Sequence, residues 1–131
     1  MSDRVIHFEI PVDEPRRAVA FYEGAFGWRI TKWDGPEAYW SVKTGEGPGI
    51  NGALLPRATV TATTNTIGVD DLDLAIAKVE KHGGSAVGEP MIIPAVGRFC
   101  YARDTEGNMF GLMQHDPEAP APPEPPEPRE V

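Results

Sequence analysis

Hydrophobic and polar side chains alternate at the start of the chain, in the segment VIHFEI at residues 5–10. A period of two predicts a β-strand, here over about residues 4–10, with His7 and Glu9 on one face and the apolar side chains on the other. An imidazole and a carboxylate one pleat apart can be two metal ligands, an acid–base pair, or the solvated face of a sheet. The rest of the sequence bears on which of these three interpretations holds.

The pattern that begins with this strand occurs twice. Residues 7–27 align without a gap to residues 64–84, at an offset of 57, and seven of the 21 aligned pairs are identical. In both copies a strand leads into an acidic residue that can cap a helix, and the apolar spacing then becomes helical, over about 15–25 and about 71–82. Self-similarity of this kind predicts two copies of one supersecondary unit.

Three short apolar segments, separated by Gly and Pro, follow each predicted helix. The sequence therefore predicts a tandem β-α-β-β-β fold of the α+β class, with module one over about residues 4–56 and module two over about residues 61–115. One helix covers one face of each sheet, so the other faces together form a curved mixed sheet with an open cup. The remaining strands are predicted at about 62–69, 28–33, 38–43, 50–55, 86–93, 98–103 and 109–114.

Composition limits the partners and divides the chain. Its 131 residues suffice for one domain, predicted over residues 1–116. Residues 117–131 contain seven Pro and four Glu and predict a disordered, extended tail. The net charge of −8 argues against nucleic acid and against an anionic membrane surface as partners. A single cysteine and the lack of any signal-like or membrane-spanning run favour the cytoplasm.

This tandem unit resembles the vicinal oxygen chelate superfamily, which includes glyoxalase I, bleomycin-resistance proteins and extradiol dioxygenases. The resemblance is carried by HFEIPVDEPRRAVAFYEGAFGW at 7–28, ARDTEGNMFGLMQ at 102–114 and GPGINGALLP at 47–56. It implies a glyoxalase-like domain with a small-molecule site in the cup, and a homodimer. In its amino-acid sequence the chain most resembles small bacterial glyoxalase-like proteins.

The resemblance also implies where a metal would bind. In metal-dependent members of the superfamily, each module supplies one ligand from its first strand and one from its last strand. These positions carry over to His7, Thr64, Gly52 and Gly111. A divalent ion needs three or four protein donors, and one imidazole, one hydroxyl and two glycines do not provide them. We therefore expect no metal cofactor, with His7 as the residue that would contribute if a site were rebuilt.

The concave face is predicted to carry the functional residues. His7 and Glu9 are the candidate catalytic pair, and the two glycines are expected to leave room at the floor of the cup. A flexible loop before Arg98 suggests that this residue gates the cup. Strand alternation adds hydroxyls and two methionines to the same face. The predicted ligand-binding residues are Asn51, Gly52, Thr64, Thr66, Arg98, Met109, Gly111 and Met113.

Two functions of different classes follow. The favoured one is a binding protein that takes up a small organic molecule in the concave pocket without a metal. The alternative is a lyase, isomerase or epimerase in which His7 and Glu9 carry out acid–base chemistry. A metal-dependent glyoxalase or dioxygenase is less favoured because of the missing donors. The sequence does not establish which aromatic residues line the pocket, because the hairpin around Gly35 leaves its register open.

Overall fold

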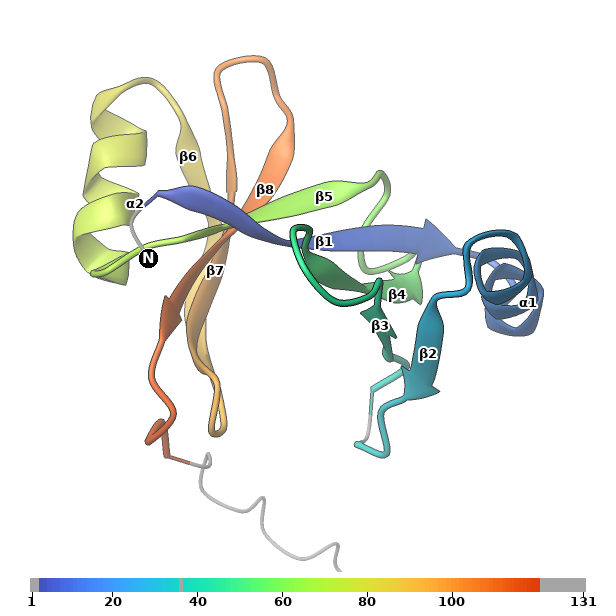
Figure 1. Ribbon diagram of the computed structural model, residues 1–131. Coiled ribbons are helices and arrows are strands. Elements are labelled where there is room, and N and C mark those ends of the chain that lie inside the picture. Colours follow the sequence, from blue (N-terminus) through green and yellow to red (C-terminus); the bar gives the residue numbers. More distant parts are fainter. Residues whose placement is uncertain (1–2, 36, 121–131) are drawn as a thin grey trace, which may run out of the picture.

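The computed structural model describes residues 3–35 and 37–120. Their strands form one sheet in the order β2-β3-β4-β1-β5-β8-β7-β6, and two helices lie outside it (Figure 1). The elements are β1 (Arg4–Val12), α1 (Pro15–Phe26), β2 (Arg29–Lys32), β3 (Trp40–Lys43), β4 (Asn51–Pro56), β5 (Thr64–Gly68), α2 (Leu72–Lys81), β6 (Ser85–Ile93), β7 (Gly97–Arg103) and β8 (Met109–His115).

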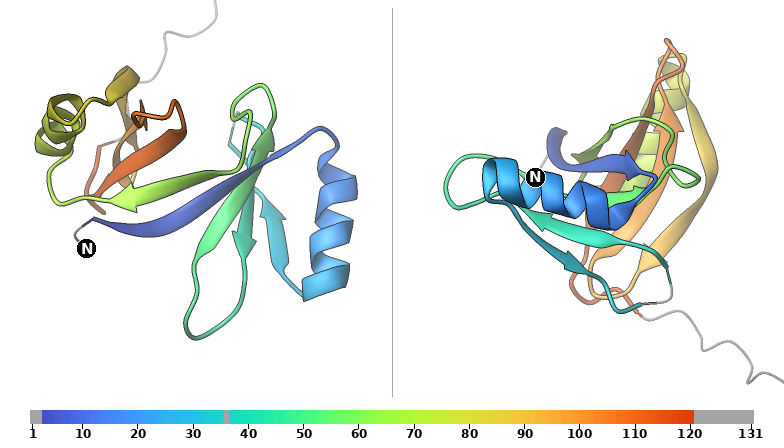
Figure 2. Two further views of the ribbon diagram at one scale, coloured as in Figure 1. Left: turned by 90° about the horizontal axis from the view of Figure 1, so that it is seen from above. Right: turned by 90° about the vertical axis from the view of Figure 1, so that its right-hand side faces the viewer.

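The sheet consists of two matching halves. In each half the first strand runs parallel to the last one, β1 beside β4 and β5 beside β8, and β1 and β5 join the halves in antiparallel orientation. Figure 2 shows the two halves turned toward one another, each with its helix on the outer side. The predicted α+β fold with two tandem β-α-β-β-β modules is confirmed.

Each helix covers a separate hydrophobic core. In the first half Val42 and Leu54 are buried beneath Tyr22 of α1, together with the rings of Trp28 and Trp40. The second core lies between α2 and strands β7 and β8. Its buried residues are Val69, Leu72, Cys100, Ala102 and Leu112. Because these side chains occupy the helix-facing positions, the residues that alternate with them along the strands face the cup.

The helix ends follow the predicted capping chemistry in one module only. The Asp71 side chain accepts a hydrogen bond from the Leu74 backbone N–H and so caps α2. Glu14, at the equivalent position before α1, makes no such bond, and this helix begins with Pro15 in its first turn. α1 ends at Gly27, whose φ of 71° is in the left-handed region.

The start of the predicted tail is part of the fold. The Asp116 backbone N–H donates to the Val96 carbonyl, the Ala95 N–H donates to the Ala119 carbonyl, and Ala119 is only 8% exposed. Residues 117–120, which the sequence assigns to the tail, thus lie against the connection between β6 and β7, and the rest of the predicted tail lies outside the described residues. Within the described ranges, neither helix is long and apolar enough to cross a membrane.

Candidate functional site

His7 and Glu9 project from β1 at the centre of the sheet. Their strand partners on β5 are Thr66 for His7 and Thr64 for Glu9. Directly paired residues of neighbouring strands have their side chains on the same face. The four residues therefore share the concave face, as the alternation and the repeat predict, and two hydroxyls from one module lie opposite an imidazole and a carboxylate from the other.

Glu9 is the buried polar centre of this face. Its side chain is 6% exposed, and Oε1 accepts a hydrogen bond of 2.5 Å from the Tyr101 hydroxyl. This length is typical of a hydroxyl bonded to a carboxylate. Tyr101 lies on β7, which β5 and β8 separate from β1, so its phenol reaches Glu9 only because the sheet curls back on itself. The hydrogen bond joins the two modules across the cup.

Burial shifts the acid–base properties of this cluster. Removal from water raises the pKa of the Glu9 carboxyl, and the hydrogen bond from Tyr101 partly offsets this rise. Burial lowers the pKa of His7, so its imidazole is neutral at pH 7. Burial and then the nearby charge of Glu9 raise the pKa of Tyr39. The pKa of Tyr101 is raised by burial and by its bond to the same carboxylate.

Two polar side chains beside Glu9 have hydrogen-bonding capacity left over. Thr66 is 2% exposed, and its Oγ1 has no hydrogen-bond partner among the described residues. The His7 imidazole, its strand partner, likewise makes no hydrogen bond within 3–35 and 37–120. Buried polar atoms such as Thr66 Oγ1 are normally paired, whereas His7 is only half-buried. The half-buried His7 imidazole, on the same strand face as Glu9, is the one of the two that a bound molecule could reach.

The two glycines do not leave the predicted space. A Cβ on Gly111 would lie 2.6 Å from the Phe99 ring and 2.8 Å from Thr66 Oγ1, so the ring already fills that part of the concave face. A Cβ on Gly52 would collide with the ring of Phe8, which packs in the core under α1. Gly52 thus faces away from the cup. The prediction that both glycines open the floor is wrong, because a phenylalanine occupies each site.

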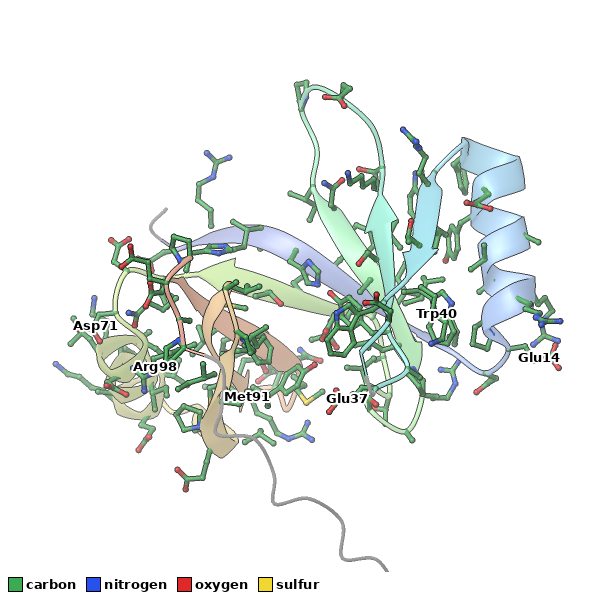
Figure 3. All side chains as sticks on the ribbon, turned by 90° about the horizontal axis from the view of Figure 1, so that it is seen from below. Glu14, Glu37, Trp40, Asp71, Met91 and Arg98 are labelled. Atoms are coloured by element: carbon green, nitrogen blue, oxygen red, sulfur yellow. The ribbon has the colours of Figure 1, made fainter. Side chains whose placement is uncertain are left out.

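Arg98 also lies outside the cup. Its guanidinium donates hydrogen bonds to both Asp73 carboxylate oxygens, at 3.3 and 3.2 Å, on the side of the sheet covered by α2. Figure 3 shows Arg98 beside this helix, near Asp71. The predicted gating position of Arg98 is therefore wrong, because strand alternation turns its side chain to the helix face. Gln114, the strand partner of Arg98, lies on the same face and accepts a hydrogen bond from the Leu72 N–H.

The remaining predicted residues are spread along the concave face. Met113 pairs with Phe99 and is buried. Met109 and Thr64 line a cavity of about 150 Å³ at the start of β5 and β8. Asn51 lies on β4 opposite His7, and its Oδ1 accepts a hydrogen bond from the Thr44 backbone N–H. A larger cavity, of about 370 Å³, lies between α1 and the end of β1, away from these residues.

Residues 4–112 match the Glyoxalase/Bleomycin resistance protein/Dioxygenase superfamily. The chain belongs to this superfamily. A protein of Mycobacterium bovis named "Putative glyoxylase CFP32" is 30% identical over 114 residues, which cover 84% of this chain and 43% of that protein. The chain thus spans less than half the length of this relative.

Solved structures of other proteins share the fold. A hypothetical protein from Bacillus halodurans superimposes with a TM-score of 0.71 at 16% identity, over 92% of this chain and all of the other chain. Methylmalonyl-CoA epimerase from Mycobacterium tuberculosis superimposes with a TM-score of 0.67 at 18% identity, over 86% of this chain and 88% of the epimerase. At such identities the likeness establishes the glyoxalase fold and nothing finer.

The donor set does not fit the metal that this superfamily implies. The strand register pairs Thr66 with Gly111 and Glu9 with Ala53, so Ala53, rather than Gly52, is the counterpart of Gly111 in module one. Neither last-strand position carries a ligand atom in its side chain. In the described part of the chain, no group of three His, Cys, Asp or Glu residues is placed to hold an ion.

Proposed function

We propose that this protein binds a small organic molecule on the concave face of its sheet, without a metal ion. The observation that carries the proposal is the buried Glu9 carboxylate, fixed by Tyr101 at the junction of the two modules. Glu9 Oε2 and the His7 imidazole share this face of β1 and are the polar groups that a bound molecule could contact. A few fixed polar groups among apolar walls are typical of small-molecule sites.

The apolar walls come from both modules. Phe99 and Tyr101 meet edge to face, with ring centroids 4.7 Å apart, on the β7 side. On the opposite side Tyr39 and Trp33 form a second edge-to-face pair, with centroids 6.2 Å apart. Binding between such rings removes apolar surface from water, at about 25 cal/mol for each Å². The polar cluster would then orient the molecule that the rings hold.

An acid–base enzyme is the second candidate, and a specific observation favours it. Burial shifts the pKa values of Glu9 and His7 in opposite directions, upward for the carboxyl and downward for the imidazole. The raised pKa makes the Glu9 carboxylate a stronger base, and groups whose pKa values are perturbed by burial are typical of acid–base sites. In a lyase, isomerase or epimerase of this kind, Glu9 Oε2 would remove a proton, and neutral His7 would donate a hydrogen bond to the developing oxyanion.

A fragment screen on the ¹⁵N-labelled full chain tests the proposed function. We expect some fragments to shift amide resonances of β1, β5 and β7, and we expect Glu9→Gln to weaken their binding. Glu80→Gln, which removes an exposed carboxylate from α2, serves as the control for the loss of one charge. Hits that all map elsewhere, or not at all, would refute the proposal. Conversion of a bound fragment by wild type but not by Glu9→Gln would establish the second candidate instead.

Three further expectations belong to this proposal and stay predictions. The first is independence from a metal, which metal analysis of the purified protein tests. The second is the homodimer that the resemblance implies, which sedimentation equilibrium tests. The third is a cytoplasmic location, which fractionation of the source cells tests.

A further inference from the structure

Among residues 3–35 and 37–120, no cation of the chain forms an ion pair with Glu9. In the described residues, the ion pairs join Arg17 with Glu14, Arg57 with Asp13 and Arg98 with Asp73, all with exposed carboxylates. Glu9 has a hydrogen bond from Tyr101 but takes part in no ion pair in that part of the chain. His7, on the same strand face, is neutral at pH 7 because burial lowers its pKa. A buried carboxylate without a positive partner is costly, which favours a ligand that brings the missing charge.

Aromatic rings surround this carboxylate from both modules. Tyr101 contacts it directly, and Tyr39 is close enough for the charge of Glu9 to raise its pKa. Trp33, which packs edge to face on Tyr39, is 45% exposed and so presents ring surface to an approaching molecule. Aromatic faces attract ammonium and guanidinium groups, and the attraction is strongest where water is excluded.

A second acidic residue, Glu37, is exposed to solvent near Tyr101. The charge of Glu37 acts on Tyr101, although the two residues come from different modules, so Glu37 lies on the side of the cup where Tyr101 is held. Figure 3 shows Glu37 on the connection between β2 and β3, and Met91 on β6. Such an arrangement of carboxylates and rings gives the opening a negative potential.

We infer that the ligand of this site is an organic cation, an ammonium or amidinium group carried on an apolar or aromatic body. This inference rests on the proposed function and names its substrate class. The cationic group would donate a hydrogen bond to Glu9 Oε2, the carboxylate oxygen that Tyr101 does not occupy. The rings of Tyr39, Tyr101 and Trp33 would contact the body of the ligand.

The affinity for an organic cation should change with pH in a defined direction. A cation prefers the ionised carboxylate, so its affinity should rise as the pH increases through the raised pKa of Glu9. A neutral ligand that accepts a hydrogen bond from protonated Glu9 would show the opposite trend. The titratable groups near Glu9 are His7 on the same face of β1, Tyr101 on β7 and Tyr39 before β3, and the charge of Glu37 acts on Tyr101. Protonated His7 would repel a cation at low pH and so strengthen the same trend.

Three matched probes test the inference: benzylammonium, benzyl alcohol and phenylacetate, titrated into the ¹⁵N-labelled full chain between pH 5 and 8. We expect benzylammonium to bind the concave face at least about tenfold more tightly than benzyl alcohol at pH 8, which is the factor that corresponds to one pKa unit of interaction. Glu9→Gln should remove this preference, and Glu80→Gln should keep it. Trp33→Leu, at an exposed ring, should weaken benzylammonium more than benzyl alcohol.

The outcomes separate this inference from the proposed function. If fragments bind the concave face but the uncharged or anionic probe binds as tightly as benzylammonium, the cation inference fails and the proposed function stands. Absence of binding by all three probes also overturns the inference, while the fragment screen decides the proposed function by itself. If Mn²⁺ broadens the resonances around Glu9 in the wild type but not in Glu9→Gln, a metal ion is the balancing cation. That result would also overturn the inference.

Discussion

Replacement of Tyr101 by Phe removes one oxygen atom from the centre of the cup and leaves the ring in place. The hydroxyl donates a 2.5 Å hydrogen bond to Glu9, which is otherwise shielded from water at 6% exposure. A hydrogen bond to a charged group contributes about 1.5–3 kcal/mol, and a neutral one about 0.5–1.5 kcal/mol. We therefore expect Tyr101→Phe to lower the free energy of unfolding by about 1.5–3 kcal/mol at a pH above the raised pKa of Glu9.

The loss of stability caused by Tyr101→Phe should depend on pH. The bond from Tyr101 lowers the pKa of Glu9 against the larger effect of burial, so its removal raises that pKa further. A group whose pKa is raised in the folded state destabilises that state as the pH rises through the folded value. The cost of Tyr101→Phe should consequently be smaller at pH 4, where the carboxyl is protonated, and should grow toward pH 8.

Urea denaturation of wild type and variants at both pH values measures these differences. Tyr39→Phe is the matched control: the charge of Glu9 acts on this residue, but no hydrogen bond joins the two side chains. It should cost less than about 0.5 kcal/mol, the usual range for a change that removes no buried partner. Equal losses for the two variants, or a cost of Tyr101→Phe that is the same at pH 4 and 8, would refute the reasoning.

Three further predictions concern glycines, caps and metal. Gly111→Ala should lower the free energy of unfolding by about 1–3 kcal/mol, because the added Cβ meets the Phe99 ring. Gly24→Ala, in open space on α1, should raise the free energy of unfolding by about 0.5–1 kcal/mol. Urea denaturation measures both changes. Asp71→Ala should lower the free energy of unfolding by about 1 kcal/mol, because it removes the side-chain cap of α2. Glu14→Ala, which removes no cap bond, should lower it by less than about 0.5 kcal/mol. Equal losses for the two variants would contradict the capping argument. Addition of Ni²⁺, Zn²⁺ or Mn²⁺ should not raise the melting temperature, and a rise that His7→Ala abolishes would contradict the assignment of the donor set.

The architecture was accessible from sequence because it is encoded by periodicity. The repeat between residues 7–27 and 64–84 fixes the two modules, and alternation in β1 fixes the face of His7 and Glu9. Both signals depend on neighbours along the chain. They therefore predicted the tandem β-α-β-β-β fold and the concave position of the first-strand residues.

The errors in the site come from distances that periodicity does not encode. Tyr101 was missed because its hydroxyl reaches Glu9 across two intervening strands, which depends on how strongly the sheet curls. Gly52 and Gly111 were given the wrong role because a glycine in a strand marks close approach, and the sequence does not say whether a ligand or a ring approaches. Alternation within β7 would have placed Arg98 on the helix face, opposite Phe99 and Tyr101.

β1 has a second consequence that concerns the order in which the protein is built. This strand precedes both of its hydrogen-bonded neighbours, β4 and β5, which begin only at Asn51 and Thr64. Contacts between segments so far apart in the chain form slowly, because a long loop must close before they are gained. The amino-terminal strand must therefore wait, unpaired, until most of the first half and the start of the second have been synthesised. The first half has no complete sheet until β1 is inserted, so a nascent chain that ends before β5 exposes an unpaired strand edge, which favours aggregation or chaperone binding.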